Sequence, residues 1–227
     1  MSGVDESAVA VGHREQEEKR ASASEQSVRK SITREYAEAL LVALLLAMFI
    51  RSFIVQAFKI PSGSMLSTLQ IGDHILVNKF LYGFRLPYPI DMTVWEWSPP
   101  QRGDVIVFIY PKDRTKDFIK RVIAVAGDSV EVRHKAVYIN GSKVNEPHAV
   151  FAEGDRETVG PRDNLGPFTV PEHKLFVMGD NRDQSHDGRF WGYVDLDDVK
   201  GKAFLIYWSW DGQETWVRWG RIGNLIR

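Results

Sequence analysis

Two serines flank a glycine in Pro61-Ser62-Gly63-Ser64-Met65, shortly after a long apolar segment. Glycine permits backbone turns that other residues resist. Such a turn can expose one serine hydroxyl as a nucleophile and leave the other to donate to an oxyanion. Serine and glycine are also common in ordinary turns, and no Gly-x-Ser-x-Gly motif is present here. This segment alone leaves both interpretations open.

A lysine interrupts the apolar segment 117–125, which reads DFIKRVIAV. Alternate side chains of a strand share a face, so Lys120 is expected beside Phe118, Val122 and Ala124. Burial among such residues lowers the pKa of a lysine, by up to about 3–5 units when it is complete. A neutral lysine can act as a general base toward a serine. The alternative is a lysine at a strand edge whose ammonium reaches solvent.

Polar residues are dense in segment 179–189, GDNRDQSHDGR, yet apolar residues lie on both sides of it, at 176–178 and 190–191. A polar loop between buried elements tends to form a hydrogen-bonded network. We therefore expect an ordered loop at this place.

Two other functions for this loop are poorly supported. Asp183, Ser185 and Asp187 match the start of a calcium-binding EF-hand loop, but Val194 stands where that loop requires a bidentate glutamate. His186 and Asp187 are adjacent and point to opposite faces of an extended chain, so they are badly placed for a proton relay. The six histidines are scattered and show no metal-ligand spacing, so we expect no metal site.

Composition narrows the class of protein. The chain has 227 residues, with 29 Lys and Arg against 30 Asp and Glu, so a dedicated nucleic-acid-binding protein is disfavoured. The absence of cysteine excludes disulfides, a thiol nucleophile, cysteine-bound zinc and iron–sulfur clusters. A hydrophobic content of 44% is enough for a folded domain with a core.

The elements that must position these residues begin with an apolar segment at 36–58, long enough to cross a membrane. Arg51 is the only charge in its second half, and its side chain can reach the interface. We interpret the segment as one uncleaved transmembrane anchor. A buried core helix and a cleaved signal peptide are the alternatives; the second lacks a clear cleavage motif.

Polar residues 1–35 precede the anchor and are predicted to be a disordered cytoplasmic tail. Arg29, Lys30 and Arg34 lie just before the apolar segment, so the positive-inside rule keeps the N-terminus in the cytoplasm. The rest of the chain then lies on the other side of the membrane.

Short β-branched and aromatic runs fill residues 59–227 and predict an extracytoplasmic domain of mainly β structure, a sandwich or an irregular barrel. Asn140-Gly141 predicts a hairpin turn. The more polar segment 131–175 is expected to form an excursion from the main sheet. The tryptophans allow two interpretations, core packing or an aromatic surface at the bilayer interface; those concerned are Trp95, Trp97, Trp208, Trp210, Trp216 and Trp219.

Taken in order, the segments resemble bacterial type I signal peptidases, the membrane-anchored serine proteases with a Ser/Lys dyad. The resemblance covers about residues 36–200, and five boxes in the expected order make it specific. The boxes are Ile60–Met65, Gly72–Phe80, Arg102–Phe108, Lys120–Ile123 with Gly127-Asp128, and Gly179–Arg189.

The resemblance implies a role for each polar candidate. Ser64 matches the nucleophile and Lys120 the general base. Ser62, with the backbone N–H of Ser64, matches the oxyanion hole, and Ser185 matches the serine that orients the lysine amine. No metal or cofactor takes part.

The resemblance also implies structural ion pairs beside the site, Asp187 with Arg189 and Arg121 with Asp180. Apolar side chains are expected to wall two shallow pockets for the small residues before the cut. These are Phe58, Ile60, Met65, Leu69, Ile75, Val107, Phe118 and Ile119. The family fold is a mostly antiparallel β catalytic core with a smaller β excursion, preceded by one N-terminal transmembrane helix.

A few positions depart from the family pattern. Ser67 stands where the family usually has proline, and Ala124-Val125-Ala126 replaces its Gly-x-Pro. Gln184 and Gly188 replace its common Asn and Ser. None of these positions is proposed to transfer a proton, so they bear on loop geometry rather than on the dyad.

The implied function is removal of signal peptides from secreted preproteins after a small-x-small motif, through an acyl-enzyme. The implied partners are preprotein signal peptides and membrane lipid, with no nucleic acid. The implied location is the bacterial inner (cell) membrane, with the catalytic domain outside the cytoplasm. Two alternatives stay open: a specialised Ser/Lys processing peptidase, for example one for pilins, or an inactive relative that only binds signal sequences.

Overall fold

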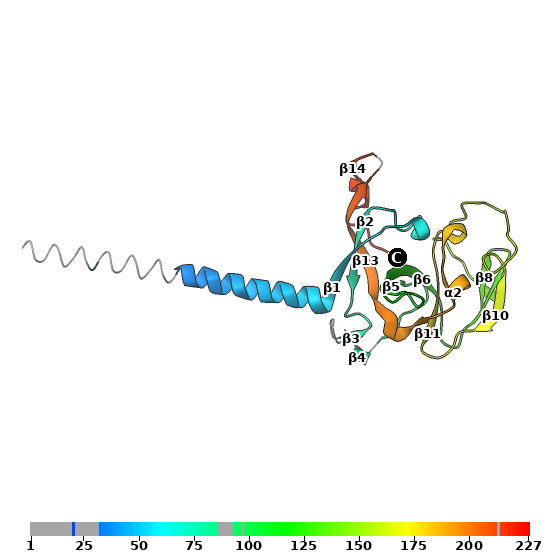
Figure 1. The fold of residues 1–227 in the computed structure, drawn as a ribbon, viewed down its shortest axis with the longest axis horizontal. Helices are drawn as coiled ribbons and strands as arrows, with labels where there is room; N and C mark the ends of the chain where they lie inside the picture. The colour runs from blue at the N-terminus through cyan, green and yellow to red at the C-terminus, as the bar shows by residue number, and fades with distance from the viewer. Residues whose placement is uncertain (1–19, 21–31, 86–92, 97, 213) are drawn as a thin grey trace, which may run out of the picture. The chain divides into compact units, whose positions relative to one another are not determined.

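The computed structural model describes residues 20, 32–85, 93–96, 98–212 and 214–227. Apart from Arg20, the expected tail up to residue 31 lies outside the described residues, and so does Trp97. The chain divides into two units, Met1–Ile50 and Arg51–Arg227. Every strand in the described part of the chain belongs to the second unit (Figure 1).

An apolar helix spans Ile32–Ile54, and its last turn, η1 (Ile50–Ile54), is π-helical. Its 23 residues rise about 1.5 Å each, which suffices for a hydrocarbon layer of about 30 Å. None of its apolar window is buried, which argues against a buried core helix. The helix begins inside the expected tail and ends before the expected boundary at Phe58.

The expected end of the helix at Phe58 is wrong, because the helix ends at Ile54 and strand β1 (Val55–Lys59) follows at once. β1 pairs antiparallel with β2 (Asp73–Asn78), from Val55 opposite Asn78 to Lys59 opposite His74. Apolar composition alone could not separate these residues from the helix. Pairing with a partner strand and the β-branched Val55 favour the extended conformation there.

The main sheet has eight strands in the order β1-β2-β13-β5-β6-β11-β12, with β14 paired to β13. Every strand pair in the described residues is antiparallel, which confirms the mainly antiparallel β fold. The remaining bounds are β5 (Val105–Ile109), β6 (Asp117–Val125), β11 (Lys174–Met178), β12 (Val194–Asp195), β13 (Val199–Asp211) and β14 (Trp216–Val217).

A smaller sheet, of order β10-β7-β8-β9, leaves the main sheet after β6 and returns to it at β11. Its strands match the predicted excursion, and Asn140 and Gly141 have φ angles of 50° and 79° in the predicted hairpin turn. The bounds are β7 (Ser129–Arg133), β8 (Ala136–Ile139), β9 (Ser142–Lys143) and β10 (Leu165–Thr169).

A two-stranded ribbon of β3 (Gly83–Arg85) and β4 (Thr93–Glu96) completes the strands. Trp95 lies in β4 and is exposed, so core packing is wrong for it. Short helical turns link the other elements. They are η2 (Gly63–Met65), η3 (Arg182–Gln184), α2 (Gly188–Trp191), η4 (Leu196–Asp198) and η5 (Trp219–Arg221).

Strand β6 does not alternate along its whole length. Val122 pairs with Val177 and Ala124 with Phe176, so β6 carries an extra residue, Ile123, at a bulge. Phe118 and Val122 pack in one apolar cluster, whereas Ala124 packs in another. The expectation that Ala124 shares the lysine's apolar face is therefore wrong.

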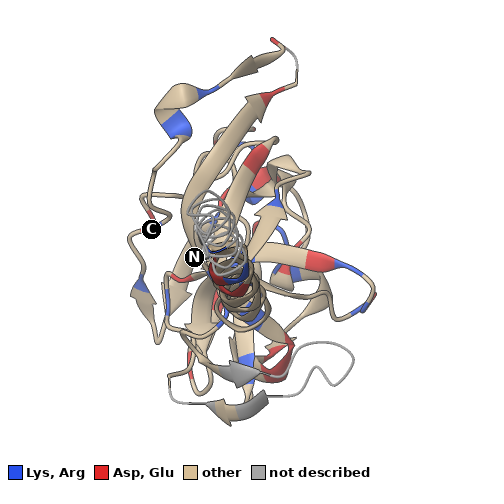
Figure 2. Ribbon diagram, turned by 90° about the vertical axis from the view of Figure 1, so that its left-hand side faces the viewer, with Lys and Arg blue, Asp and Glu red and all other residues tan. Residues whose placement is uncertain are grey.

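The tryptophans near the C-terminus lie at the surface, so core packing is wrong for them. Trp208 and Trp210 on β13 are 37% and 41% exposed, and Trp216 and Trp219 are 66% and 63% exposed. Residues 203–210 of β13 carry no charge. Basic and acidic residues are scattered over other elements of the unit (Figure 2).

Candidate active site

The two serines lie where β1 gives way to the short turn η2. Ser62 is extended and exposed, and its hydroxyl makes no capping hydrogen bond to the turn. Ser64 is at the centre of the turn, and Met65 behind it is fully buried. The Leu66 N–H donates to the Gly63 carbonyl at 3.2 Å and closes the turn. A buried methionine thus anchors a turn that presents Ser64.

Lys120 projects from β6 toward this turn. Its Nζ lies 2.7 Å from Ser64 Oγ and 2.9 Å from the Ile119 carbonyl oxygen. The side chain is buried, with the ammonium 5.5 Å from the centre of the Phe118 ring. Burial lowers the pKa of Lys120 to about 8, although the carboxylates of Asp187 and Asp180 oppose the shift. The expected solvent-exposed alternative for this lysine is therefore wrong.

Asp187 and Arg189 form one of the two expected ion pairs. Arg189 Nε and Nη2 donate to the two carboxylate oxygens at 2.9 Å each, and the Gly179 N–H donates to Oδ2 at 3.0 Å. Burial alone would raise the pKa of Asp187, but the hydrogen bonds and charge of Arg189, together with the hydrogen bond from the Gly179 N–H, keep the pKa below its usual value. Asp187 therefore stays ionised near the lysine.

Arg121 and Asp180 form the second expected pair. Arg121 Nε and Nη2 donate to Asp180 at 2.8 and 2.7 Å, and both side chains are buried. Thr68 Oγ1 donates to the same carboxylate at 2.5 Å. Through Thr68, the pair therefore ties β6 to the segment that follows η2.

Ser185 lies close to Gly179, which packs against Ser64, but the structure gives Ser185 no hydrogen bond to Lys120. Its hydroxyl is buried beside Asp187, and no described atom meets it with normal hydrogen-bond geometry. A Cβ at Gly179 would lie 2.3 Å from Ser185 Oγ and 2.4 Å from the Ser64 carbonyl oxygen. Only glycine lets these three residues pack so closely.

His186 and Asp187 are separated, as their adjacency predicts. His186 is exposed and stacks on Phe190, with ring centres 5.3 Å apart, while Asp187 is buried. They do not form a relay. Among the residues that the structure describes, no three His, Asp or Glu side chains gather in a way that could hold a metal ion.

The expected pocket residues gather beside η2, with one exception. Seven of them share one apolar cluster, in which only Phe58 and Ile119 keep some exposure, while Phe118 packs in a different cluster. The seven are Phe58, Ile60, Met65, Leu69, Ile75, Val107 and Ile119.

Several residues that hold the loop 179–189 in place were not predicted from the sequence. Asn181 contacts η2 through its backbone and its side chain. Arg182 forms a two-point ion pair with Glu146, at 2.6 and 2.7 Å, and Lys135 pairs with Asp183 at 3.0 Å. These partners are far apart in sequence, so spacing gave no signal for them.

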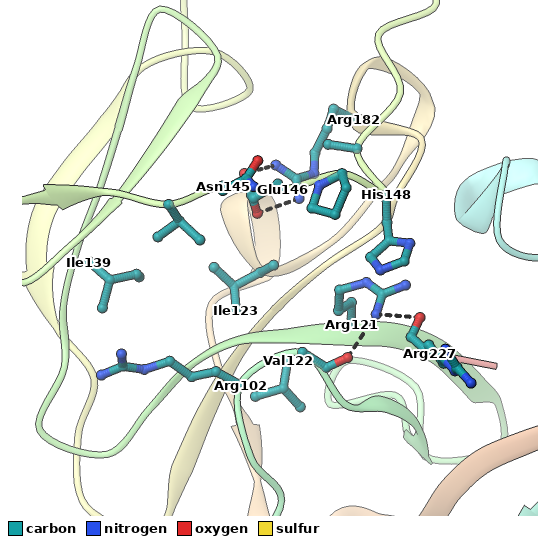
Figure 3. Close-up of a pocket in the computed structure, with 14 residues that line it drawn as sticks. Arg102, Arg121, Val122, Ile123, Ile139, Asn145, Glu146, His148, Arg182 and Arg227 are labelled. Atoms are coloured by element: carbon teal, nitrogen blue, oxygen red, sulfur yellow. Dashed lines mark hydrogen bonds and ion pairs between the residues drawn. The ribbon is translucent and has the colours of Figure 1, made fainter.

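A cavity of about 340 Å³ lies behind this loop, between the main sheet and the segment 144–149. Arg121 and Arg182 both line it, and Figure 3 shows Arg182 meeting Glu146 on one side and Arg121 reaching the Arg227 backbone oxygen on the other. The two ion-paired arginines thus support the loop from behind.

Residues 33–208 match the family model described as signal peptidase, peptidase S26. A signal peptidase I from Pseudomonas fluorescens is 41% identical over 78% of this chain and 72% of its own length, and one from Pseudomonas aeruginosa is 38% identical over the same shares. One from Aquifex aeolicus is 34% identical over 75% of this chain and 82% of its own. A crystal structure of a signal peptidase I from Enterococcus faecalis is 34% identical over 45% of this chain and 95% of its own, with a TM-score of 0.38.

The family model covers most of the chain, including every residue of the Ser64 and Lys120 site described above. The relatives exceed 30% identity over more than two thirds of this chain. The chain therefore belongs to the signal peptidase family, peptidase S26, and is a hydrolase of the serine peptidase type.

Proposed function

We propose that this protein removes signal peptides from exported preproteins, with Ser64 as nucleophile and Lys120 as general base. One observation carries the proposal: a buried lysine amine lies 2.7 Å from the hydroxyl of Ser64. That distance suits direct proton transfer. A lysine whose pKa is about 8 is substantially neutral under mildly alkaline conditions, so it can accept the proton.

The reaction follows from these positions. Neutral Lys120 takes the proton of Ser64 while Oγ attacks the scissile carbonyl carbon. The Ser62 hydroxyl and the Ser64 N–H donate to the oxyanion that forms. Lys120, now protonated, gives its proton to the leaving amine, and an acyl-enzyme remains. The same lysine then takes a proton from a water molecule, whose oxygen attacks the ester carbon. The ester bond to Ser64 Oγ breaks, and the lysine returns the proton to Oγ, which restores both residues.

The substrate is proposed to bind as an added strand. β1 lies at one end of the main sheet, so its outer edge is open for pairing in the described residues. β6 pairs with β11 only from Arg121 onward, so the first part of β6 also has an open edge there. Phe58 on β1 and Ile119 on β6 belong to one cluster and remain partly exposed. Because Phe58 and Ile119 are large, they leave room only for small substrate side chains, which favours a small-x-small motif before the cut.

The membrane is the proposed location. The unburied apolar helix suits an uncleaved anchor, and the exposed tryptophans suit a bilayer interface. The expected orientation keeps the N-terminus in the cytoplasm of a bacterial cell and the catalytic unit outside it. A cleaved signal peptide would remove the helix, and N-terminal sequencing of the protein from membranes distinguishes the two.

Two other functions compete with this one. A specialised processing peptidase would cut one preprotein and reject others, whereas a general one would cut several unrelated preproteins. An inactive relative that captures signal sequences would cut none. The close contact of Ser64 and Lys120 favours an enzyme, since binding alone gives no reason to bury a lysine against a serine.

The test uses the full chain in detergent with several unrelated preproteins, and the new N-termini are sequenced. We expect a single cut after a small-x-small motif in each preprotein. Ser64→Ala should lower the rate by on the order of 10⁴-fold or more while the protein remains folded. Cleavage by Ser64→Ala near the wild-type rate would refute the nucleophile, and cleavage of one preprotein alone would favour the specialised peptidase.

A further inference from the structure

Asn181 makes two contacts with the nucleophile turn that no role assigned so far explains. Its backbone N–H donates to the Ser64 carbonyl oxygen at 3.1 Å, and its side-chain Nδ2 donates to the Gly63 carbonyl oxygen at 3.1 Å. The residue is 3% exposed. A carbonyl only accepts hydrogen bonds, so the amide nitrogen must face Gly63. The orientation of the Asn181 side chain is thereby set by the turn it contacts.

The Gly63 carbonyl and the Ser64 N–H belong to the same peptide unit. A trans peptide is planar, so these two groups point in opposite directions. A hydrogen bond that fixes the Gly63 carbonyl therefore also fixes the direction of the Ser64 N–H. No described residue accepts a hydrogen bond from that N–H, as expected for the first turn of a short helix.

Asn181 is itself held firmly. It pairs with Val150 in a parallel bridge, in which the Val150 N–H donates to the Asp180 carbonyl at 2.8 Å and the Arg182 N–H donates to the Val150 carbonyl at 2.9 Å. Its neighbours Asp180 and Arg182, both buried, form ion pairs with Arg121 and Glu146. Both sides of Asn181 are fixed, so its contacts can impose a geometry on the turn.

We propose that Asn181 is a positioning residue that aims the Ser64 N–H at the substrate oxyanion. The proposal rests on the proposed role of Ser64 as nucleophile and extends it. Asn181 does not touch the substrate or the reacting atoms. It acts through the peptide unit between Gly63 and Ser64, and its loss removes a preformed donor rather than the dyad.

This role has a kinetic signature that a general structural role lacks. Loss of one oxyanion donor costs on the order of 10²–10³-fold in kcat, and misdirecting it should cost about 10²-fold. KM should change little, because the donor acts mainly in the transition state. The acidic limb of the pH–rate profile should stay where it is in the wild type, because Lys120 is untouched.

The experiment compares Asn181→Leu, which keeps the shape but cannot donate, with Gln184→Ala. Gln184 is exposed, and its Oε1 accepts from the same Nδ2 at 3.3 Å, so its loss removes the other acceptor. The full chain is assayed in detergent for kcat, KM, the pH profile and the affinity for a peptide aldehyde. The Ser64 hydroxyl adds to the aldehyde carbonyl and forms a tetrahedral adduct, whose oxygen lies where the substrate oxyanion would lie. Titration with the aldehyde gives the concentration of active sites in each preparation, and each kcat is calculated from that concentration so that misfolded protein does not lower it.

We expect Asn181→Leu to lose about 10²-fold in kcat per site and a similar factor in aldehyde affinity, with Gln184→Ala within about twofold of wild type. A wild-type rate for Asn181→Leu, an unchanged aldehyde affinity, or a shifted acidic limb would each overturn the proposal. If Asn181→Leu does not fold, Asn181→Ser, whose hydroxyl is too short to span the same gap, takes its place. Activity in Ser64→Ala would instead refute the proposed nucleophile.

Discussion

Lys120 and Ser64 meet in one hydrogen bond, yet the two residues are positioned by different means. Lys120 lies on β6, a nine-residue strand inside the main sheet, where β5 pairs opposite it with Ile106 at the same register. Ser64 lies on a three-residue turn whose carbonyl groups are held by the loop that contains Asn181. The proposed base is thus placed by its own element, and the proposed nucleophile by a distant one.

The difference predicts where the active site is sensitive. A residue within a sheet is held by many backbone hydrogen bonds, so single substitutions around it move it little. A residue on a short turn is held by a few contacts, and each of them matters more. Changes at Lys120 should therefore lower the rate of proton transfer, whereas changes at the loop residues packed against Ser64, such as Gly179 and Asn181, should alter the geometry at Ser64.

The largest effect is expected at the base itself. Lys120→Arg keeps a cation but cannot become neutral, so kcat should fall by on the order of 10⁴-fold at every accessible pH. In the wild type, kcat/KM should rise with pH through an apparent pKa of about 8, as the lysine loses its proton. Lys116→Arg, on an exposed side chain, is the matched control and should match the wild type. Strong activity in Lys120→Arg would refute Lys120 as the general base.

A smaller loss is expected at the exposed serine beside the turn. Ser62→Ala removes one oxyanion donor but leaves the dyad intact, so kcat should fall by on the order of 10²–10³-fold with KM little changed. Ser67→Ala, three residues beyond the nucleophile and exposed, provides the control and should stay within about twofold of the wild type. An unaltered kcat in Ser62→Ala would mean that Ser62 is only a turn residue.

Next comes the contact between the loop and the turn. Gly179→Ala places a Cβ within 2.4 Å of the Ser64 carbonyl oxygen, so the turn must shift, and a shift near 1 Å costs about 10²-fold in rate. Gly220→Ala meets no atom within 4 Å and should be silent. Measuring kcat and thermal stability for both variants separates a displaced serine from a lost fold. Equal activity in the two variants would show that the loop does not position Ser64.

The smallest expected effect is on stability, and it concerns the base. The folded pKa of Lys120 is lowered to about 8, so the unfolded chain binds more protons between that pH and the lysine's ordinary 10.5. The cost of burying the charge is full below pH 8 and shrinks as pH rises toward 10.5. Lys120→Met removes this cost, about 3 kcal/mol from the shift, but also loses two hydrogen bonds of about 1 kcal/mol each.

Lys120→Met should therefore be more stable than wild type by about 1 kcal/mol at pH 7, and should lose that advantage by pH 10. Thermal melting of the full chain in detergent at both values measures it. An advantage that grows with pH would contradict the lowered pKa.

The sequence predicted the parts that depend on local pattern. The hairpin at Asn140-Gly141, the smaller β excursion and the lysine in an apolar strand follow from turn chemistry and alternation. The pairing of Ser64 with Lys120 came from the family resemblance, because nothing local links residues 56 positions apart.

Tertiary contacts explain what the sequence did not predict. The end of the helix was placed too late because β1 is apolar too, and only its pairing with β2 makes it a strand. The position of Ala124 was wrong because a bulge breaks alternation at Ile123. Asn181 was missed because its importance lies in the carbonyl groups it meets, which belong to a turn more than a hundred residues earlier.

The absence of any linker between the helix and β1 has a consequence for where the enzyme cuts. Val55 follows Ile54 directly, so Ser64 is tied to the helix end by a chain of at most about 35 Å, much of it fixed in β1. With the helix in the membrane as proposed, the length of this connection sets the largest distance between Ser64 and the membrane surface. It limits the height above the bilayer at which a peptide bond can be cut, and hence the number of residues between a substrate's apolar segment and its cleavage site.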